Sequence, residues 1–282
     1  MKVTLIILGC IVGLIFLLVI ASTIGLVFFR GQARQEAAGL LSSTSKEAGA
    51  VVIESDLEGL PEPVQKYLRY TGIVGKERTR SVRLKMKGRF RMKPEQGWFP
   101  MTAEEYYTVD PPSLVWFGKV NTFPLLSVTA TDKYALGKGR MHVKLLSLFT
   151  VADAKGVEMN EGAMIRYLNE AMWHPTTFLA DYISWEHIDS RSARVIMTDQ
   201  GLSVSATCHF NEKGEMVNFT ADRIYSGTET KEEWHTPLVE YREFNGIRIP
   251  YRGSALWKLE QGDFHYIDVE ITEIDYNSGS TY

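Results

Sequence analysis

The stretch 81-SVRLKMKGRFRM-92 decides the fold class of this chain. Apolar Val82 and Leu84 begin a regular alternation with basic residues, a period of two that is typical of a β-strand with one buried and one solvated face. The basic positions of the alternation are Arg83, Lys85, Lys87, Arg89 and Arg91. Turn residues follow at 94–97, so a returning strand is predicted over 98–109.

Similar short segments, separated by turn residues, continue almost to the end of the chain. Further strands are expected over 114–123, 127–136, 140–151, 193–199, 202–210, 216–225, 231–244, 247–259 and 264–276. The dipeptide Asn245-Gly246 predicts a hairpin turn, because both residues tolerate positive φ. The fold class is therefore predicted to be mainly β (α+β), a strongly curled antiparallel half-barrel of about ten or eleven strands.

Two segments of the chain carry helical periodicity. A short helix is predicted after Pro61, since proline suits a first helical turn, and Gly72 is a natural stop. A second helix is predicted between Asn160 and His174, where apolar residues recur at helical spacing before a histidine–proline pair. We expect one of these helices to plug the concave side of the sheet.

An uncharged apolar run, 3-VTLIILGCIVGLIFLLVIASTIGLVFF-29, precedes the predicted sheet. About 20 apolar residues in a helix span a bilayer, and the run is longer than the apolar core of a cleaved signal peptide. Residues 1–30 are therefore predicted to be a transmembrane anchor. Residues 31–59 are polar and rich in small residues, which predicts a stalk or linker, and residues 60–282 form the half-barrel domain.

The charges beside the apolar run bear on its orientation. Lys2 precedes the run, and Arg30 and Arg34 follow it, so the count of basic residues on each flank does not favour either membrane orientation. A very short basic tail before one long span is typical of an uncleaved signal anchor. We therefore expect a single-pass protein with its domain on the extracytoplasmic side.

Charge is unevenly spread along a chain whose net charge is −3. Residues 76–93 hold nine Lys or Arg and one Glu, whereas residues 259–282 hold six acids and no Lys or Arg. The basic strand could contact anionic lipid headgroups at the membrane surface. Alternatively, the first and last strands are neighbours, and the basic side chains pair with acids such as Asp268 and Glu270. The acidic balance argues against nucleic acid as a partner.

The second helix and the residues after it form the candidate ligand site. Its members are Met164, Tyr167, Leu168, Glu170, Met172, Trp173, His174 and Trp185. Flexible thioethers and aromatic rings suit an adaptable apolar site, and they equally suit an ordinary core. A less favoured hypothesis is a hydrolase that uses His174 with Glu170 or Asp181 for acid–base chemistry.

No motif supports that hydrolase hypothesis or a cofactor. The chain has no serine elbow, no His-Glu-x-x-His motif and no glycine-rich phosphate loop. Its two cysteines are Cys10, in the apolar run, and Cys208, so no disulfide within the domain and no cysteine metal site is expected. The sequence thus favours a protein that is not an enzyme and needs no cofactor or metal.

Several stretches resemble an uncharacterised bacterial membrane-anchored family of unknown function. They are 60-LPEPVQKYL-68, 99-FPMTAEEYY-107, 166-RYLNE-170 and 173-WHP-175. This resemblance covers nearly the whole domain and implies a family but no activity. More loosely, a curled antiparallel sheet with 245-NGIRIP-250 is similar to the half-barrel of LolA-like lipoprotein carriers, which hold acyl chains in an apolar concavity.

Together these observations predict a protein of the bacterial cell membrane that binds an apolar or lipid ligand without catalysis. The alternative is a scaffold or regulator that uses the sheet as a partner surface. Fold alone does not choose between the two, because similar folds serve many functions.

Overall fold

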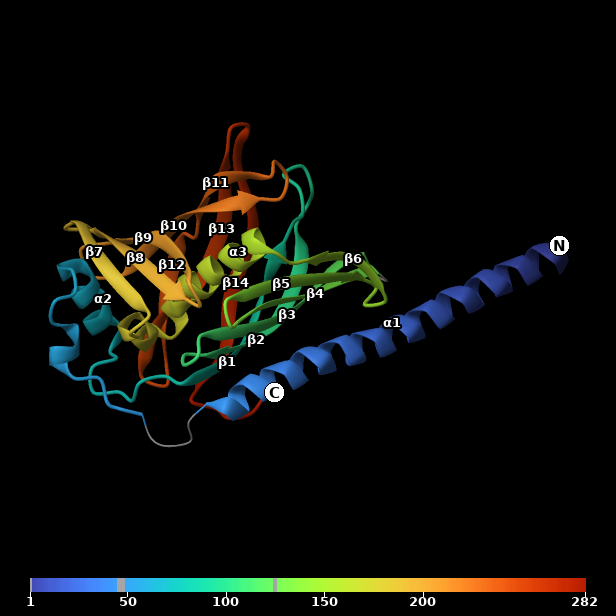
Figure 1. The fold of residues 1–282 in the computed structure, drawn as a ribbon. Coiled ribbons are helices and arrows are strands. Elements are labelled where there is room, and N and C mark those ends of the chain that lie inside the picture. Colours follow the sequence, from blue (N-terminus) through green and yellow to red (C-terminus); the bar gives the residue numbers. More distant parts are fainter. Residues whose placement is uncertain (1, 45–48, 124–125) are drawn as a thin grey trace.

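The computed structural model of the protein describes residues 2–44, 49–123 and 126–282. Its strands form one antiparallel sheet of 14 members, drawn in Figure 1. They are β1 (Ser81–Phe90), β2 (Phe99–Thr108), β3 (Ser113–Phe123), β4 (Leu126–Ala135), β5 (Lys138–Leu145), β6 (Phe149–Ala154), β7 (Ile183–Asp189), β8 (Ser192–Asp199), β9 (Leu202–Phe210), β10 (Met216–Tyr225), β11 (Thr230–His235), β12 (Leu238–Phe244), β13 (Ile247–Leu259) and β14 (Gly262–Tyr276). The helical segments are α1 (Lys2–Ser43), η1 (Glu54–Leu57), α2 (Glu62–Thr71), α3 (Val157–Glu170), η2 (Ala171–Trp173) and η3 (Pro175–Leu179).

The first and last strands meet in the middle of the sheet. The strand order is β6-β5-β4-β3-β2-β1-β14-β13-β11-β10-β9-β8-β7, and β12 pairs with β13 beside this path. Two antiparallel meanders therefore run outward from the β1–β14 pair, one toward β6 and the other toward β7. The predicted mainly β half-barrel is confirmed, together with its long apolar N-terminal helix.

The strand count of ten or eleven is corrected to 14. The range 140–151 holds the end of β5 and the start of β6, because the backbone turns at Leu146, whose φ is 54°. The range 231–244 is divided into β11 and β12 at Pro237, which has no N–H to donate to a ladder. Residues 183–189, for which no strand was predicted, form β7.

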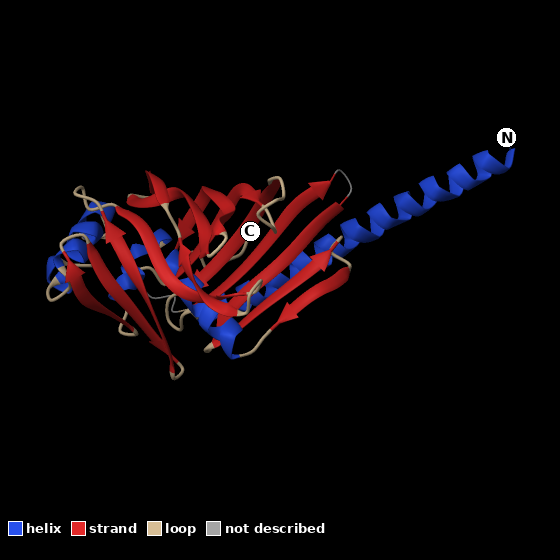
Figure 2. Ribbon diagram, turned by 90° about the horizontal axis from the view of Figure 1, so that it is seen from above, coloured by secondary structure: helices blue, strands red, loops and turns tan. Residues whose placement is uncertain are grey.

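The connection between the two outer strands passes over the concave side of the sheet. It begins after β6, runs through α3, η2 and η3, and ends at β7. α3 contacts β4 and β5 on one half of the sheet and β9 and β10 on the other. Figure 2 shows the strands curling around these short helices. Side chains from α2, α3 and the concave face of the sheet form the main hydrophobic core.

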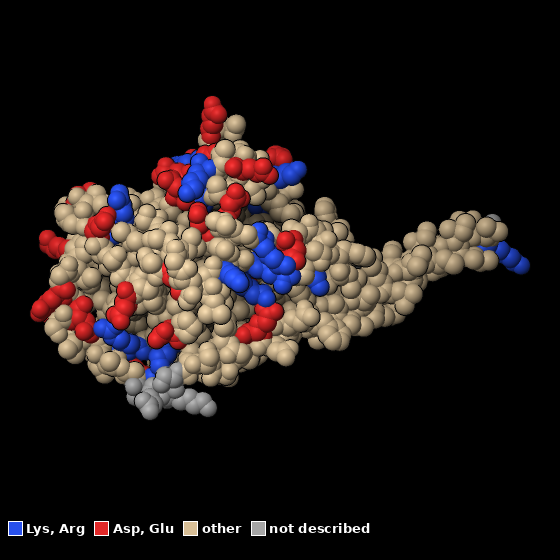
Figure 3. Space-filling view, viewed as in Figure 1, with Lys and Arg blue, Asp and Glu red and all other residues tan. Residues whose placement is uncertain are grey.

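α1 is one continuous helix of 42 residues that has two different environments. Its C-terminal part, including residues 31–43 of the expected stalk, lies against β2 and β3. The buried stripe consists of Phe29, Ala33, Ala37 and Leu41, which pack against Tyr106, Val115 and Phe117. The N-terminal part projects from the domain and is bare of charged side chains except near its tip (Figures 1 and 3). The predicted boundaries between anchor, stalk and domain, at residues 30 and 59, stay a prediction.

Candidate functional site

The residues predicted to bind a ligand lie between α3 and the sheet, where side chains fill the interior. Met164, Tyr167 and Leu168 are fully buried in the main core, and Met172, Trp173 and His174 are also buried. Glu170 is buried as well, and Trp185 is half-buried against Phe178. These residues come together as expected, but in this structure they pack against one another.

Arg166 of α3 is the centre of a buried charge cluster. Its guanidinium donates to Glu105 Oε1 at 2.9 Å, to Asp132 Oδ2 at 2.8 Å and to Glu170 Oε1 at 2.8 Å. One cation therefore faces three carboxyl groups from β2, β4 and α3. The second oxygens of Glu105 and Asp132 are buried and have no hydrogen-bond partner among the described residues.

The electrostatics of this cluster favour a shared proton. Burial raises the pKa of Glu105 well above its ordinary value, and repulsion from Glu170 adds to that effect. Burial also raises the pKa of Glu170, although Arg166 opposes the shift. Two carboxyl groups this close in a dry site titrate as a pair, so one of them holds a proton where an exposed glutamate would be ionised.

His174 does not form an acid–base pair in this structure. Its Nδ1 lies 2.6 Å from Thr177 Oγ1, and its Nε2 has no partner within the described part of the chain. Burial lowers the pKa of the imidazole to about 3, so the ring is neutral. Tyr107 separates it from Glu170, because the Tyr107 hydroxyl donates to Glu170 at 3.1 Å while its ring packs on His174. Asp181 is exposed.

The basic strand is paired with the last strand along its length. The ion pairs are Arg83–Asp275 at 2.9 Å, Lys85–Glu273 at 2.8 Å, Lys87–Glu270 at 3.2 Å and Arg89–Asp268 at 2.5 Å. Arg91 instead donates to the backbone oxygens of His265 and Pro94. The structure therefore has the cross-strand arrangement, and membrane contact by this strand stays a prediction.

A groove of about 730 Å³ lies on the outer face of the sheet, across β2, β1, β14, β13 and β12. Pro100, Thr102 and Val239 line it, and the backbones of Met101 and Val269 form part of its floor, because the side chains of these two residues pack toward the main core. The paired charges of β1 and β14 border it, together with Arg252, which forms ion pairs with Glu240 and Glu270. The groove thus combines apolar surface with charges that are already neutralised by neighbours.

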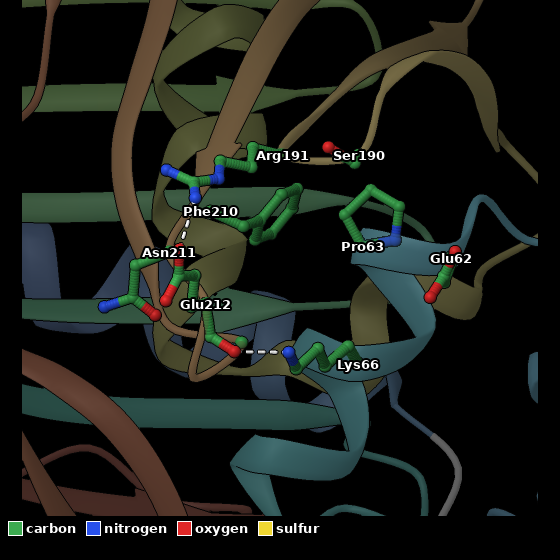
Figure 4. A pocket seen from close by; sticks show the side chains of 9 residues that line it. Glu62, Pro63, Lys66, Ser190, Arg191, Phe210, Asn211 and Glu212 are labelled. Atoms are coloured by element: carbon green, nitrogen blue, oxygen red, sulfur yellow. Dashed lines mark hydrogen bonds and ion pairs between the residues drawn. The ribbon is translucent and has the colours of Figure 1, made fainter.

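A smaller pocket of about 190 Å³ lies between α2 and the turns that flank β8 and β9 (Figure 4). Lys66 donates to the backbone oxygen of Glu212, whose carboxylate forms an ion pair with Arg191. Pro63 and Phe210 line the remaining wall. Ligand pockets for small molecules occupy roughly 300–1,000 Å³, so of these two cavities the groove on the outer face reaches that range.

Glu104 is the functional side chain that the sequence analysis missed. It is buried beneath α1, where Arg30 Nη2 approaches it to 2.6 Å and Arg34 Nε to 2.7 Å. Burial alone would raise the pKa of Glu104, but hydrogen bonds from the two arginines outweigh it and lower the pKa. The signal in the sequence is a pair of adjacent acids inside an otherwise apolar strand, opposite two arginines that directly follow the apolar run.

No group of three His, Cys, Asp or Glu side chains in residues 2–44, 49–123 and 126–282 is arranged to hold a metal ion. The described part of the chain contains one helix that is long and apolar enough to cross a membrane, which is α1.

The observations so far define a class of protein: a curled antiparallel half-barrel that carries a long apolar helix at its N-terminus. Within that class, the chain belongs to the Family of unknown function (DUF6544), whose model matches residues 50–269. This confirms the expected membership of an uncharacterised family. Comparison with curated proteins gave no match.

Solved structures of the LolA superfamily resemble this fold. One is described as an outer membrane lipoprotein-sorting protein domain from Vibrio parahaemolyticus, with 7% identity, a TM-score of 0.36, and coverage of 71% of this chain and 87% of that chain. Another is a LolA superfamily protein from Nitrosomonas europaea, with 10% identity, a TM-score of 0.36, and coverage of 75% and 92%. A β-barrel-like protein from Brucella abortus matches with 8% identity, a TM-score of 0.23, and coverage of 71% and 98%.

Proposed function

We propose that this protein is a single-pass, membrane-anchored binding protein without catalytic activity, and that it takes an apolar or lipid ligand in the groove on the outer face of its sheet. The observation that carries the proposal is the groove itself. Its volume of about 730 Å³ is that of a small-molecule site, and Pro100 and Val239 give it apolar side chains.

The projecting part of α1 supports the membrane anchor. Its side chains are exposed from residue 3 to residue 20, and they are almost all apolar. A helical stretch of that composition is unfavourable in water and favourable in the hydrocarbon core of a bilayer. In the proposed arrangement, the domain lies on the extracytoplasmic side of a bacterial cell membrane.

The groove lies on the same face of the sheet as α1, and both use β2. Side chains at alternate positions of a strand point to the same face. Pro100 and Thr102 line the groove, and Glu104 and Tyr106, further along the same face, lie beneath α1. The ligand site is therefore next to the helix that anchors the domain, within reach of lipid.

A second candidate function is a scaffold or regulator at the membrane. The packing between α3 and the sheet supports it, because Met164, Tyr167 and Leu168 are fully buried there as members of the main core. In that case the outer groove is a docking surface for a protein. The paired charges along β1 and β14 would then form the rim of an interface.

Photo-crosslinking to lipid tests the leading proposal. The full chain in nanodiscs is exposed to a photoactivatable, clickable fatty acid and phospholipid, and labelled peptides are mapped by mass spectrometry. We expect label on β2 and β12, at peptides that contain Met101 or Val239. Thr102→Trp should fill the groove and reduce that labelling at least tenfold. The matched control is Ser205→Trp, on an exposed position of β9 outside the groove.

Each outcome of this experiment bears on the choice of function. Labelling that is confined to α1, or that is equal in the Thr102→Trp and Ser205→Trp variants, would rule out lipid binding in the groove. Loss of a co-purifying protein in the Thr102→Trp variant, without any lipid label, would favour the scaffold.

A further inference from the structure

Two hairpins of the sheet extend alongside α1 on the membrane side of the domain. They are the β3–β4 hairpin and the β5–β6 hairpin, and Figures 1 and 2 both show them running beside the helix. The β5–β6 turn lies beside the start of β4, because Leu146 N–H donates to Ser127 O at 2.8 Å.

The β5–β6 turn touches α1 inside the apolar run. Ser22 Oγ donates to the backbone oxygen of Leu146 at 2.8 Å. A Cβ on Gly25 would lie 2.8 Å from Ser147 O and 2.9 Å from a methyl group of Leu148, so only glycine allows this approach. The end of the sheet is therefore fixed to α1 at residues that the sequence assigns to the membrane anchor.

The length of α1 sets where this contact lies relative to a bilayer. The apolar run begins at Val3, and about 20 apolar residues lie between this point and Ser22, which at about 1.5 Å per residue makes roughly 30 Å. That is about the thickness of a hydrocarbon core. The near surface of the bilayer therefore falls at Ser22–Gly25, at the level of the β5–β6 turn.

The strand ends at this level carry exposed apolar side chains. The exposed fractions are 66% for Phe123, 40% for Leu126, 58% for Phe149 and 58% for Val151. They lie near α1, which the β5–β6 turn approaches at Ser22 and Gly25, and Val27 and Phe28 of α1 are exposed to a similar degree. Apolar surface of this kind is unfavourable in water, and a contiguous patch marks an interaction site.

The charges behind these strand ends fit a lipid interface. The sequence has no charged residue over 120–131 or over 145–152. The first charges on the way back into the sheet are both basic, Lys119 and Lys144. Basic side chains at this depth can reach anionic headgroups while the residues ahead of them contact acyl chains.

We propose that the end of β3 at Phe123, the start of β4 at Leu126 and the β5–β6 turn enter the interfacial layer of the bilayer beside α1, with Phe123, Leu126, Phe149 and Val151 as the inserted side chains. This inference rests on the membrane anchor of the proposed function and goes beyond it. The domain then has two attachments to the membrane, a spanning helix and these apolar strand ends. Together they fix which way the sheet faces.

Depth measurement by spin labelling tests this geometry in the full chain. Cys10→Ser leaves Cys208, which is buried, and single cysteines are added at Phe123 and Phe149. Both positions are exposed, so labelling does not disturb the core. In nanodiscs, we expect relaxation of these labels by oxygen to exceed relaxation by a water-soluble nickel complex. The controls are Ile15→Cys in the middle of the span and Ile188→Cys on the exposed edge strand β7.

The controls separate the two ways in which the inference can fail. If Ile15→Cys reports the bilayer while Phe123→Cys and Phe149→Cys match the aqueous Ile188→Cys, the strand ends stay in water and the inference is wrong although the anchor stands. If Ile15→Cys is itself aqueous, the anchor and the inference both fall. As a second measurement, Phe123→Asp with Phe149→Asp should make a spin label at Lys119→Cys more accessible to the nickel complex, and an unchanged accessibility would contradict the inference.

Discussion

Glu104 and Glu105 are consecutive residues of β2 whose carboxylates lie on opposite faces of the sheet, and each is bound by arginine from a different helix. Arg30 and Arg34 of α1 hold Glu104 on the outer face. Arg166 of α3 holds Glu105 on the concave face. One strand therefore positions both the membrane helix and the helix that crosses the interior, so a shift of either helix should also displace β2.

Glu104→Gln should loosen α1 from the sheet. The substitution removes the charge that Arg30 and Arg34 share, which should weaken the contact by about 2 kcal/mol. Faster hydrogen exchange over residues 29–41, measured by mass spectrometry on the full chain, would report the change. Glu36→Gln is the control, since Glu36 is exposed and pairs with Lys133. Equal exchange in both variants would contradict the role given to Glu104.

The same contact should depend on pH in a defined direction. The arginines lower the pKa of Glu104 below its ordinary value, despite burial. A lowered carboxyl pKa contributes stability that is present above the ordinary glutamate pKa and is lost as pH falls through the lowered one. Exchange over residues 29–41 should therefore accelerate only in the acid range below about pH 4. Glu104→Gln should abolish that acceleration.

The contribution of Glu105 to stability should depend on pH in the opposite direction, and Glu105→Gln should remove that dependence. Burial and Glu170 raise the pKa of Glu105, so the folded protein holds a proton that the unfolded chain releases. Stability then falls as pH rises from the ordinary glutamate pKa toward the raised one. Removal of this penalty should stabilise the protein at pH 8 by about 1 kcal/mol or more. Denaturant unfolding of both proteins between pH 4.5 and 8 checks it, and parallel curves would refute it.

The sequence predicted the antiparallel sheet, because alternation of residues such as Val82 and Leu84 with basic ones follows directly from strand geometry. It also anticipated that the first and last strands are neighbours, since their opposite charges needed partners. It did not predict the split at Leu146, because a leucine with positive φ leaves no pattern. Neither could it predict that β2 is buried on both faces, since that depends on where α1 lies.

For the candidate ligand site, too, the sequence alone could not predict the outcome. The apolar stripe around Met164 and Tyr167 was visible in the sequence, but core and ligand pocket have the same composition. Only packing distinguishes them. The outer groove joins five strands that are far apart in the chain, and its walls are ordinary strand residues such as Thr102 and Val239. Residues of that kind have no spacing that would mark them.

Neutralising the basic strand separates its two possible roles. Lys85→Ser should destabilise the fold by less than about 1 kcal/mol, because its ion pair with Glu273 is exposed. If the strand touches anionic lipid, each lost charge should also weaken binding to phosphatidylserine vesicles by about 1 kcal/mol. Denaturation and vesicle co-flotation measure the two effects. Vesicle binding that is unchanged after Lys85→Ser and Lys87→Ser would restrict the strand to its pairing with β14.

Truncation of α3 decides whether its apolar stripe is core or ligand site. Leu168 is fully buried in the main core, so Leu168→Ala should lower the unfolding free energy by about 3 kcal/mol. Met164→Leu conserves volume and should cost less than about 1.5 kcal/mol. Denaturant unfolding of the full chain in detergent gives both values. If the stripe is a ligand site, Leu168→Ala should leave stability nearly unchanged and should lower lipid labelling. That result would place the ligand between α3 and the sheet.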